Sequence, residues 1–223
     1  MVKLVAFFKR RPGMSPEDFQ RHWRTVHAEL VVRQAGMRRY VQNHVLLGSY
    51  RRGEPAFDGV AEAWFDDTDA MRALAPSRAY AAVRADEASF IDPASMGVVL
   101  CDELVIAAGA VPAGAVKWIG FIKKRGDLSV DAFQEYWRTR HGEIAARIPG
   151  VLRYVQCHAR KGIYAAGRTP AFDGIPMTWF ADVDALRESG RGPAFEATRA
   201  DEKNFMGHGA FPSVVAEEHE IAV

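Results

Sequence analysis

The order of apolar and polar positions along the chain predicts strands and helices in the same succession twice. In the first half, the periods of two and of about 3.6 residues distinguish strands from helices. Strands are expected at 2–9, 38–47, 57–65 and 96–106, and helices at 15–36, 66–75 and 77–90. Phe19, Trp23 and His27 lie at i, i+4 and i+8 and therefore share one side of the first helix. The order β-α-β-β-α-β is that of a ferredoxin-like unit.

The second half repeats the first with a shift of 114 residues. Between Leu4–His44 and Trp118–His158 the alignment has no gap, and 18 of 41 positions are identical. One extra residue in the second copy raises the shift to 115 further along the chain. Such self-similarity indicates a duplicated module. We therefore expect an α+β fold with one domain at 1–106, a linker of small residues at 107–114 and a second domain at 115–223.

Composition narrows the classes of function. The chain has 29 Lys and Arg against 28 Asp and Glu, which gives a formal net charge of +1. Nucleic acids and anionic membranes attract surfaces with an excess of positive charge, so neither is an expected partner. No stretch approaches the roughly 18 apolar residues of a membrane-spanning helix. The apolar start Met1–Phe8 continues into Lys9-Arg10-Arg11 without a cleavage site, and we expect a cytoplasmic location.

The usual metal and cofactor motifs are missing from the sequence. Cys101 and Cys157 occupy non-equivalent positions of the two copies, which argues against a disulfide framework or a cysteine-bound zinc ion. His27 and Glu29 form an i, i+2 pair, whose side chains diverge on a helix instead of converging on a metal. Gly-rich loops for a phosphate or a dinucleotide do not occur. No cofactor and no metal are therefore expected.

Alternation along the predicted strands places Tyr, Gln and His on one face. This polar stripe consists of Tyr40, Gln42 and His44, and of Tyr154, Gln156 and His158 in the second copy. The helices of a ferredoxin-like sheet cover one face, so the other face must be buried elsewhere. The polar stripe is too polar for a dry core and too aromatic for a plain solvated surface, and we expect it to line a ligand cavity. An exposed strand of residues with high β propensity is the alternative.

Two pairs of histidines are the candidates for acid–base chemistry. His27 and His141 lie one turn after a tryptophan, and an imidazole titrates near neutral pH. Their alternative role is structural, as a cap of the helix end or a donor to a backbone carbonyl. His44 and His158 are the rival candidates, because a tyrosine precedes each of them by four residues on the same strand face. Such a Tyr–His pair could remove a proton next to a carbonyl and hydrogen-bond the resulting enolate.

Further polar and aromatic residues are candidates for substrate binding. They are Gln42, Gln156, Asp58, Asp173, Trp64, Trp179 and Glu62. The two aspartates precede a glycine at a strand start, which favours a turn role, although within a cavity they could orient a histidine. The two tryptophans are expected in the apolar wall, with ordinary core packing as the alternative.

Met177 replaces Glu62 in the second copy, which suggests that one half is active and the other supports it. The repeated Arg-Ala-Asp-Glu at 84–87 and 199–202 is interpreted as a salt-bridged helix surface.

Together these motifs resemble the EthD family, which is named after ethyl tert-butyl ether degradation. The resemblance covers both halves and rests on Lys9-Arg10-Arg11, the Trp23-x-x-x-His27 helix, Arg39–Gln42, Asp58-Gly59 and Trp64-Phe65. It implies a dimeric α+β barrel, formed within one chain by the two ferredoxin-like repeats, and it makes His27 and His141 a hallmark of the family pattern. The wider superfamily includes cofactor-independent monooxygenases, polyketide cyclases, isomerases, dehydratases and haem-using enzymes, so the fold leaves the reaction open.

The first hypothesis is a cofactor-independent lyase, dehydratase or isomerase that acts on a hydrophobic cyclic or aromatic small molecule. A histidine serves as base or acid, Tyr and Gln hold a carbonyl or phenol oxygen, and Trp and Phe exclude water. The alternatives are a cofactor-free monooxygenase of a phenolic substrate and a non-catalytic protein that binds a small molecule such as haem. The identity of the substrate, the active half and the association of tandem chains into a homodimer stay open.

Overall fold

The chain folds into two compact units of the same architecture. The computed structural model describes all residues, 1–223. The first unit comprises Met1–Cys101 together with Glu218–Val223, and the second comprises Asp102–Glu217. None of the helices is both long and apolar enough to cross a membrane.

The first unit follows the predicted element order, with short turns between the elements. Its elements are β1 (Val2–Phe8), α1 (Pro16–His22), the π-helical turn η1 (Trp23–His27), α2 (Ala28–Val31), β2 (Met37–Val45), the 3₁₀ turn η2 (Leu47–Arg52), β3 (Gly59–Phe65), α3 (Thr68–Arg72), α4 (Arg78–Phe90), the 3₁₀ turn η3 (Pro93–Ser95) and β4 (Gly97–Ala108). Ser15 caps α1, because its side chain accepts a hydrogen bond from the backbone N–H of Asp18.

The second unit repeats this order. Its elements are β5 (Val116–Gly120), α5 (Val130–Tyr136), the π-helical turn η4 (Trp137–His141), α6 (Gly142–Ala145), β6 (Arg153–Ala159), α7 (Lys161–Ala165), β7 (Gly174–Phe180), α8 (Val183–Ser189), α9 (Pro193–Glu202) and β8 (Ser213–Ile221). Strand β4 ends at Ala108, two residues beyond the predicted strand end, and its residues after Cys101 belong to the second unit. The segment 109–115 then connects β4 to β5.

The strand pairing confirms the α+β class and the ferredoxin-like repeats. In the first unit, β1 lies between β3 and β4, and β2 pairs with the other edge of β3. In the second unit, β5 lies between β7 and β8, and β6 pairs with β7. All of these pairings are antiparallel. The hydrogen-bonded strand order is β2-β3-β1-β4 in the first unit and β6-β7-β5-β8 in the second.

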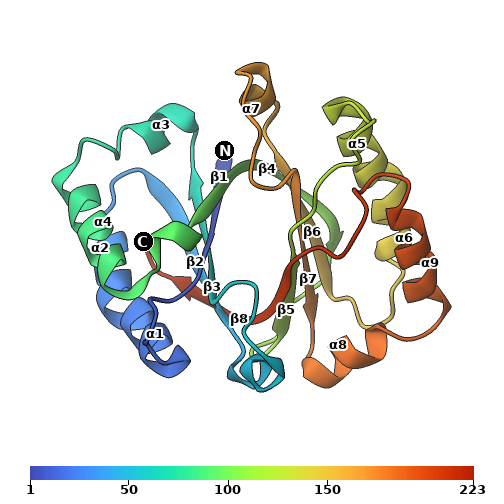
Figure 1. Cartoon of the computed structure of the whole chain (residues 1–223), viewed down its shortest axis with the longest axis horizontal. Helices are drawn as coiled ribbons and strands as arrows, with labels where there is room; N and C mark the ends of the chain where they lie inside the picture. Colours follow the sequence, from blue (N-terminus) through green and yellow to red (C-terminus); the bar gives the residue numbers. More distant parts are fainter. The chain divides into compact units, whose positions relative to one another are not determined.

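Helices cover one face of each unit's sheet. In the first unit α1, α2 and α4 lie on one side of the strands, and in the second unit α5, α6 and α9 do the same (Figure 1). The covered core of the first unit contains Phe8, Phe19, Trp23 and Phe90. Its aromatic rings are in direct contact, with the Phe8 and Trp23 centroids 5.1 Å apart. This aromatic layer fixes the position of the π-helical turn above the sheet.

A steric constraint explains why a glycine stands at the start of β3 and of β7. A Cβ atom at Gly59 would lie 2.7 Å from Cζ3 of Trp23, and a Cβ atom at Gly174 would lie 2.3 Å from Cζ3 of Trp137. Only glycine lets the indole ring approach the strand so closely. The repeated Asp-Gly pair is therefore a packing requirement of the tryptophan helix.

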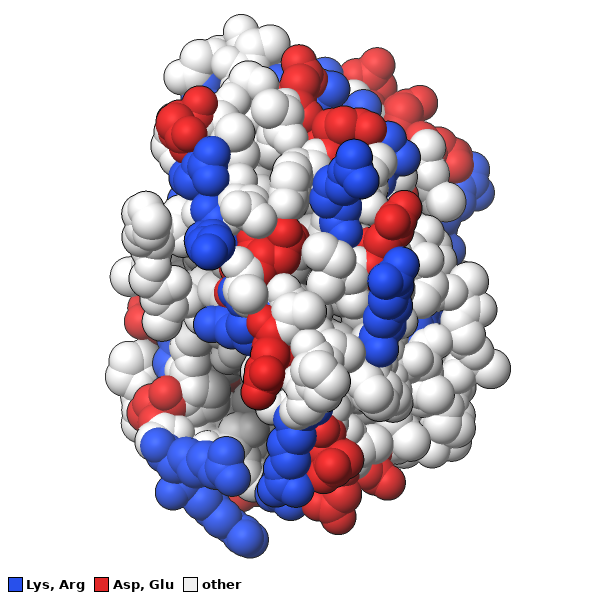
Figure 2. Space-filling model, turned by 90° about the vertical axis from the view of Figure 1, so that its right-hand side faces the viewer, with Lys and Arg blue, Asp and Glu red and all other residues white.

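Charges of both signs are interspersed on the outer helices of the second unit. Figure 2 shows Lys and Arg beside Asp and Glu over this side of the molecule, with no extended field of one sign. Several of these charges are paired along one helix at i, i+3, such as Arg138 with Glu135 and Arg187 with Asp184. Exposed pairs of this kind contribute little stability. Their arrangement agrees with the balanced composition of the chain.

Candidate active site

The polar stripe faces the helices. The Tyr40 hydroxyl accepts a hydrogen bond from Nε1 of Trp23 at 3.1 Å, and Nε2 of Gln42 donates to the Trp23 carbonyl at 2.8 Å. The His44 ring stacks on Trp23 with the centroids 4.6 Å apart. The expectation that the stripe lies on the face free of helices is therefore wrong. Its polar atoms are buried at low cost because the indole N–H and the π-helical carbonyl supply partners.

The opposite face carries Glu62 and the two strand tryptophans. Nζ of Lys3 lies 2.6 Å from Oε2 of Glu62 and 4.5 Å from the ring centroid of Trp64. In the second unit Nζ of Lys117 lies 4.4 Å from the Trp179 ring centroid. These residues lie on the sheet face away from the helices, so the tryptophans contact cations and do not form the apolar wall that the sequence suggested. Alternation of the strand explains this, because Trp64 follows the helix-facing Ala63 directly.

A pocket lies between the sheet and the helices of each unit. The pocket of the second unit has a volume of about 430 Å³, and that of the first unit about 360 Å³. Both fall within the size range of small-molecule sites. The lining residues of the two pockets largely correspond through the repeat, and His27 with Tyr40 in one and His141 with Tyr154 in the other are among them. We call them the first and the second pocket.

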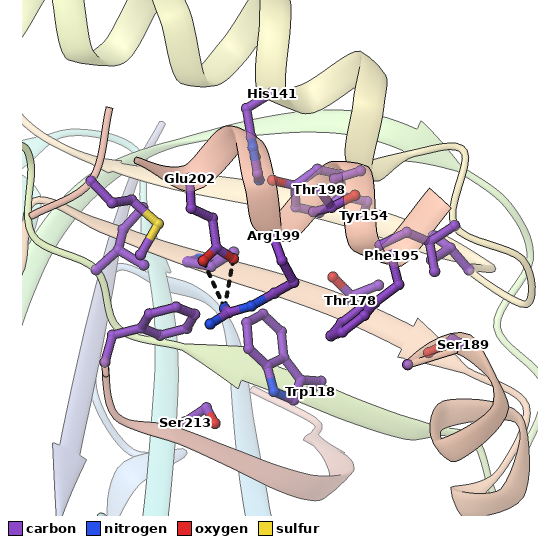
Figure 3. A pocket seen from close by; sticks show the side chains of 18 of the residues that line it. Trp118, His141, Tyr154, Thr178, Ser189, Phe195, Thr198, Arg199, Glu202 and Ser213 are labelled. Atoms are coloured by element: carbon purple, nitrogen blue, oxygen red, sulfur yellow. Dashed lines mark hydrogen bonds and ion pairs between the residues drawn. The ribbon is translucent and has the colours of Figure 1, made fainter. Parts of the chain in front are cut away.

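Each pocket contains a histidine bound to an aspartate. In the second pocket Nδ1 of His141 lies 2.9 Å from Oδ2 of Asp201, and in the first Nδ1 of His27 lies 2.8 Å from Oδ2 of Asp86. The aspartate therefore accepts the Nδ1 proton of a neutral ring and leaves the Nε2 lone pair unprotonated. Nε2 of His141 has no hydrogen-bond partner within the chain. Figure 3 shows the His141 ring reaching from its helix toward the pocket.

Burial keeps these histidines neutral. It lowers the pKa of His141 below the ordinary value, although the hydrogen bond and the charge of Asp201 act in the opposite direction. The pKa of His27 is lowered for the same reasons, with Asp86 as the opposing group. Burial alone would raise the pKa of Asp201, but hydrogen bonds from Tyr136, Asn204 and His141 hold it below its usual range. An ionised aspartate beside a neutral imidazole is the arrangement of a general base.

The second pocket also contains a tyrosine whose proton is unused. The Tyr154 hydroxyl accepts hydrogen bonds from Nε1 of Trp137 at 3.2 Å and from Nε2 of Gln156 at 3.0 Å. Two donors occupy the oxygen, and its own O–H has no acceptor within the chain. Burial raises the pKa of Tyr154 to about 12, so the phenol stays protonated. It can donate to an oxygen of a bound ligand.

His44 and His158 do not line either pocket. Nε2 of His158 lies 2.9 Å from Oε1 of Gln156, and Nε2 of His44 lies 2.9 Å from Oε1 of Gln42. Each histidine thus fixes the glutamine amide that binds the π-helical carbonyl. Burial lowers the pKa of both rings to about 3. Their contacts are those of positioning residues.

The strand-start aspartates hold loops and do not contact a histidine. Asp58 accepts hydrogen bonds from the Arg10 backbone N–H at 2.8 Å and from the Tyr50 hydroxyl at 2.6 Å. Asp173 accepts from the Lys124 backbone N–H at 3.0 Å and from a tyrosine hydroxyl of α7. The role of orienting a histidine belongs to Asp86 and Asp201 instead. The signal for these two aspartates is the repeated Arg-Ala-Asp-Glu, which the sequence reading assigned to a helix surface.

The same repeated motif places an ion pair at each pocket. In the second pocket Nη1 of Arg199 lies 2.7 Å from Glu202, and the guanidinium lies 5.5 Å from the Phe211 ring centroid. Figure 3 marks this pair beside the pocket residues. Arg84 and Glu87 form the equivalent pair at the first pocket. No group of three or more His, Cys, Asp or Glu side chains is arranged to hold a metal ion.

Comparison with known proteins places the repeats in one family. The family model of the EthD domain matches residues 11–94 and again residues 125–209. None of the curated proteins matches the sequence at a significant level.

Solved structures that cover nearly the whole chain share its fold at low sequence identity. An anthrone oxidase-like protein has 11% identity and a TM-score of 0.64 and covers 100% of this chain and 93% of its own. A presumed monooxygenase from Fusobacterium nucleatum subsp. nucleatum has 10% identity and a TM-score of 0.60, with 99% and 92% covered. An EthD family protein from Bacillus halodurans C-125 has 24% identity and a TM-score of 0.39, covering 47% of this chain and 99% of its own.

Proposed function

The chain belongs to the EthD family, and from that premise we propose that it is a cofactor-independent enzyme of general acid–base catalysis. Its substrate would be a hydrophobic cyclic or aromatic small molecule. The observation that carries the proposal is the pairing of an aspartate-bound histidine with a proton-donating tyrosine in one pocket of about 430 Å³. The reaction that this pairing supports best is elimination or isomerisation next to a carbonyl group.

In the proposed reaction the Tyr154 hydroxyl donates a hydrogen bond to the substrate carbonyl. Nε2 of His141 then takes the proton from the adjacent carbon, and the C–H electron pair forms an enolate whose oxygen Tyr154 stabilises. For a substrate with a hydroxyl on the next carbon, the enolate expels that group. The imidazolium returns the proton to the leaving oxygen, so that water departs and a conjugated enone remains. No electron acceptor is consumed.

The surroundings of the histidine support this proton transfer. Asp201 stabilises the imidazolium formed in the first step and holds the ring in the tautomer with an open Nε2. The apolar lining, which includes Trp137 and Phe205, limits access of water to the enolate. The lowered pKa of His141 keeps the base unprotonated at neutral pH. Turnover is therefore expected to fall when the pH drops through that lowered pKa.

A second candidate is oxygenation of a phenolic substrate. It is favoured by the fold that the chain shares with the anthrone oxidase-like protein and the presumed monooxygenase. The same base would take the phenol proton, and O₂ would oxidise the electron-rich ring system. In converting a ring CH₂ to C=O, one oxygen atom would enter the product and the other would leave as water. This reaction differs from elimination in its use of O₂.

The test is a turnover screen of the full chain with cyclic β-hydroxy ketones. Formation of the enone is followed by ultraviolet absorbance, with and without O₂ in the solution. The variant His27→Ala/His141→Ala removes both candidate bases, and His208→Ala is the control because His208 is exposed and outside both pockets. We expect turnover in the wild type and the control, and a loss of about 100-fold or more in the double variant.

The outcomes separate the candidates. Equal rates with and without O₂ support elimination, whereas stoichiometric consumption of O₂ by phenolic substrates supports the second candidate. A double variant as active as His208→Ala would exclude these histidines as the base. Binding of the ketones without turnover would favour a carrier protein.

A further inference from the structure

One row of side chains crosses the sheet beneath the second pocket. Tyr154 on β6 is the register partner of Thr178 on β7, and Thr178 is the register partner of Trp118 on β5. All three residues line the pocket. Figure 3 shows them along its sheet side, with His141 reaching in from the helices. Register partners on neighbouring strands lie about 5 Å apart at Cβ, so the row forms one continuous surface.

The equivalent row of the first pocket has one residue with a polar group, whereas the row of the second pocket has three. Tyr40 on β2 is the register partner of Ala63 on β3, and Ala63 is the partner of Leu4 on β1. These residues also line their pocket. Alanine thus stands where the second pocket has threonine, and leucine stands where it has tryptophan. The catalytic pair of histidine and tyrosine is present in both pockets, so the two differ in what surrounds the reacting group.

The additional polar atoms of the second pocket are available to a ligand. Neither Oγ1 of Thr178 nor Nε1 of Trp118 has a hydrogen-bond partner within the chain, and both side chains are partly exposed. The first pocket has its own polar side chains elsewhere, because Gln34 and Tyr80 stand where the second pocket has Ile148 and Phe195. Two further exchanges in the second pocket do not add to its available polar atoms. Thr198 replaces Val83 but donates to the Ala194 carbonyl at 2.8 Å, and Ser189 donates to the Leu186 carbonyl at 2.7 Å.

We infer that the second pocket binds an aromatic or cyclic ligand with several hydroxyl or carbonyl oxygens. Beyond the oxygen held by Tyr154, one ligand oxygen pairs with Thr178 and another accepts from the indole N–H of Trp118. The inference rests on the proposed function, which assigns the oxygen at the reacting end of the ligand to Tyr154. The remaining oxygens decide which molecule is bound, because a site that offers hydrogen-bond groups discriminates against analogues that lack the matching oxygens.

Binding of two small probes to the full chain tests this inference. The probes are naphthalene and a naphthalenediol with its hydroxyls on alternate carbons of one ring, and isothermal titration measures both affinities. Thr178→Val removes a hydroxyl at nearly constant shape, and Trp118→Phe removes the indole N–H but keeps an aromatic ring. Thr178→Ser restores a hydroxyl, and Thr169→Val is the control because Thr169 is exposed and outside the pocket.

We expect the double variant Thr178→Val/Trp118→Phe to bind the diol about 10- to 100-fold more weakly, as two neutral hydrogen bonds are lost. Its affinity for naphthalene should change less than about threefold, because naphthalene has no oxygen for these two groups to bind. Thr178→Ser and Thr169→Val should bind the diol like the wild type.

Unchanged affinity for the diol in the double variant would overturn the inference, and so would an equal loss for both probes. These results leave the proposed function untouched, because the double histidine variant is judged by turnover and not by binding. Conversely, a chain without turnover that still prefers the diol through Thr178 and Trp118 would retain this inference for a binding protein.

Discussion

At the scale of the residue, the four repeat histidines differ in their partners. His27 and His141 are bound to carboxylates, which partly offset the effect of burial on their pKa values. His44 and His158 are bound to glutamine amides, and no such charge opposes their burial. An amide oxygen accepts the proton of a neutral imidazole but compensates a buried imidazolium poorly. The first pair is therefore suited to gain a proton during a reaction, and the second pair is suited to stay neutral.

This difference predicts that stability declines as the pH falls. The folded pKa of His44 and His158 is about 3, whereas the unfolded value is near 6.5. Between these values the unfolded chain binds one more proton at each site, so the free energy of unfolding falls by roughly 1.4 kcal/mol per pH unit and per histidine. Urea unfolding at neutral pH and near pH 5 measures the slope.

The variant His44→Phe tests the assignment of that slope. Phenylalanine can stack on Trp23 but cannot bind a proton, so the slope should decrease by about one proton. His208→Gln, at an exposed site, should leave the slope as in the wild type. An unchanged slope in His44→Phe would show that the buried histidine does not contribute.

The tyrosine hydroxyl gives a second prediction at this scale. Tyr154→Phe removes the proposed donor to the enolate oxygen, and kcat should fall by about 100- to 1000-fold with a smaller change in KM. The matched variant Tyr40→Phe makes the same change in the first pocket. Steady-state kinetics compare the two, and equal effects of both variants would contradict a special role of Tyr154.

At the scale of the element, the π-helical turn and the strand-start glycine depend on each other. The Trp137 carbonyl accepts from the Gly142 backbone N–H across the wide turn and from the Gln156 amide. The indole ring of Trp137 then lies against Gly174 and reaches the Tyr154 hydroxyl. A wide helical turn of this kind often occurs at functional sites. Here it connects the helix that bears the histidine to the strand that bears the tyrosine.

Gly174→Ala is predicted to disturb this connection. The new Cβ would lie 2.3 Å from Trp137, so the ring must move, and we expect a loss of about 1–3 kcal/mol in the free energy of unfolding, together with reduced turnover. Gly162→Ala is the control, because it lies in α7 with no atom within 4 Å of the added Cβ and alanine favours a helix. Equal stability of the two variants would refute the steric explanation.

The sequence predicted most of the elements because their signals are local. Ser15, the i, i+4, i+8 spacing of Phe19, Trp23 and His27, and the strand alternation all describe neighbours along the chain. The π-helical turn was not predictable, because the carbonyl of Trp23 is held by a distant glutamine side chain. Alternation identified which residues share a face but did not decide which face the helices cover. The polar stripe was assigned to the wrong side for that reason.

At the scale of the whole molecule, the duplication identified the repeated residues in the sequence but did not indicate which residues act together or how the two copies differ. The histidine was identified from the sequence, while its aspartate partner was interpreted as helix surface. That aspartate lies about 60 positions further along the chain than the histidine, and only folding brings the two together. The differences between the pockets were likewise invisible, because Ala63/Thr178 and Leu4/Trp118 are ordinary exchanges until the register aligns them with Tyr40 and Tyr154.

Two pockets in one chain allow the activity of each half to be read from single variants. If both pockets turned over substrate equally, His27→Ala and His141→Ala would each retain half of the wild-type kcat. We expect instead that His27→Ala stays near the wild-type value and that His141→Ala falls to about 1% or less. The reason is the second pocket's larger volume and its unpaired Thr178 and Trp118 groups, which match an oxygenated substrate. Each variant leaves its aspartate with other partners, His22 for Asp86 and both Tyr136 and Asn204 for Asp201, so the two should lose similar stability, and urea unfolding verifies that match. Retention of half the activity in both variants would establish two equivalent active pockets.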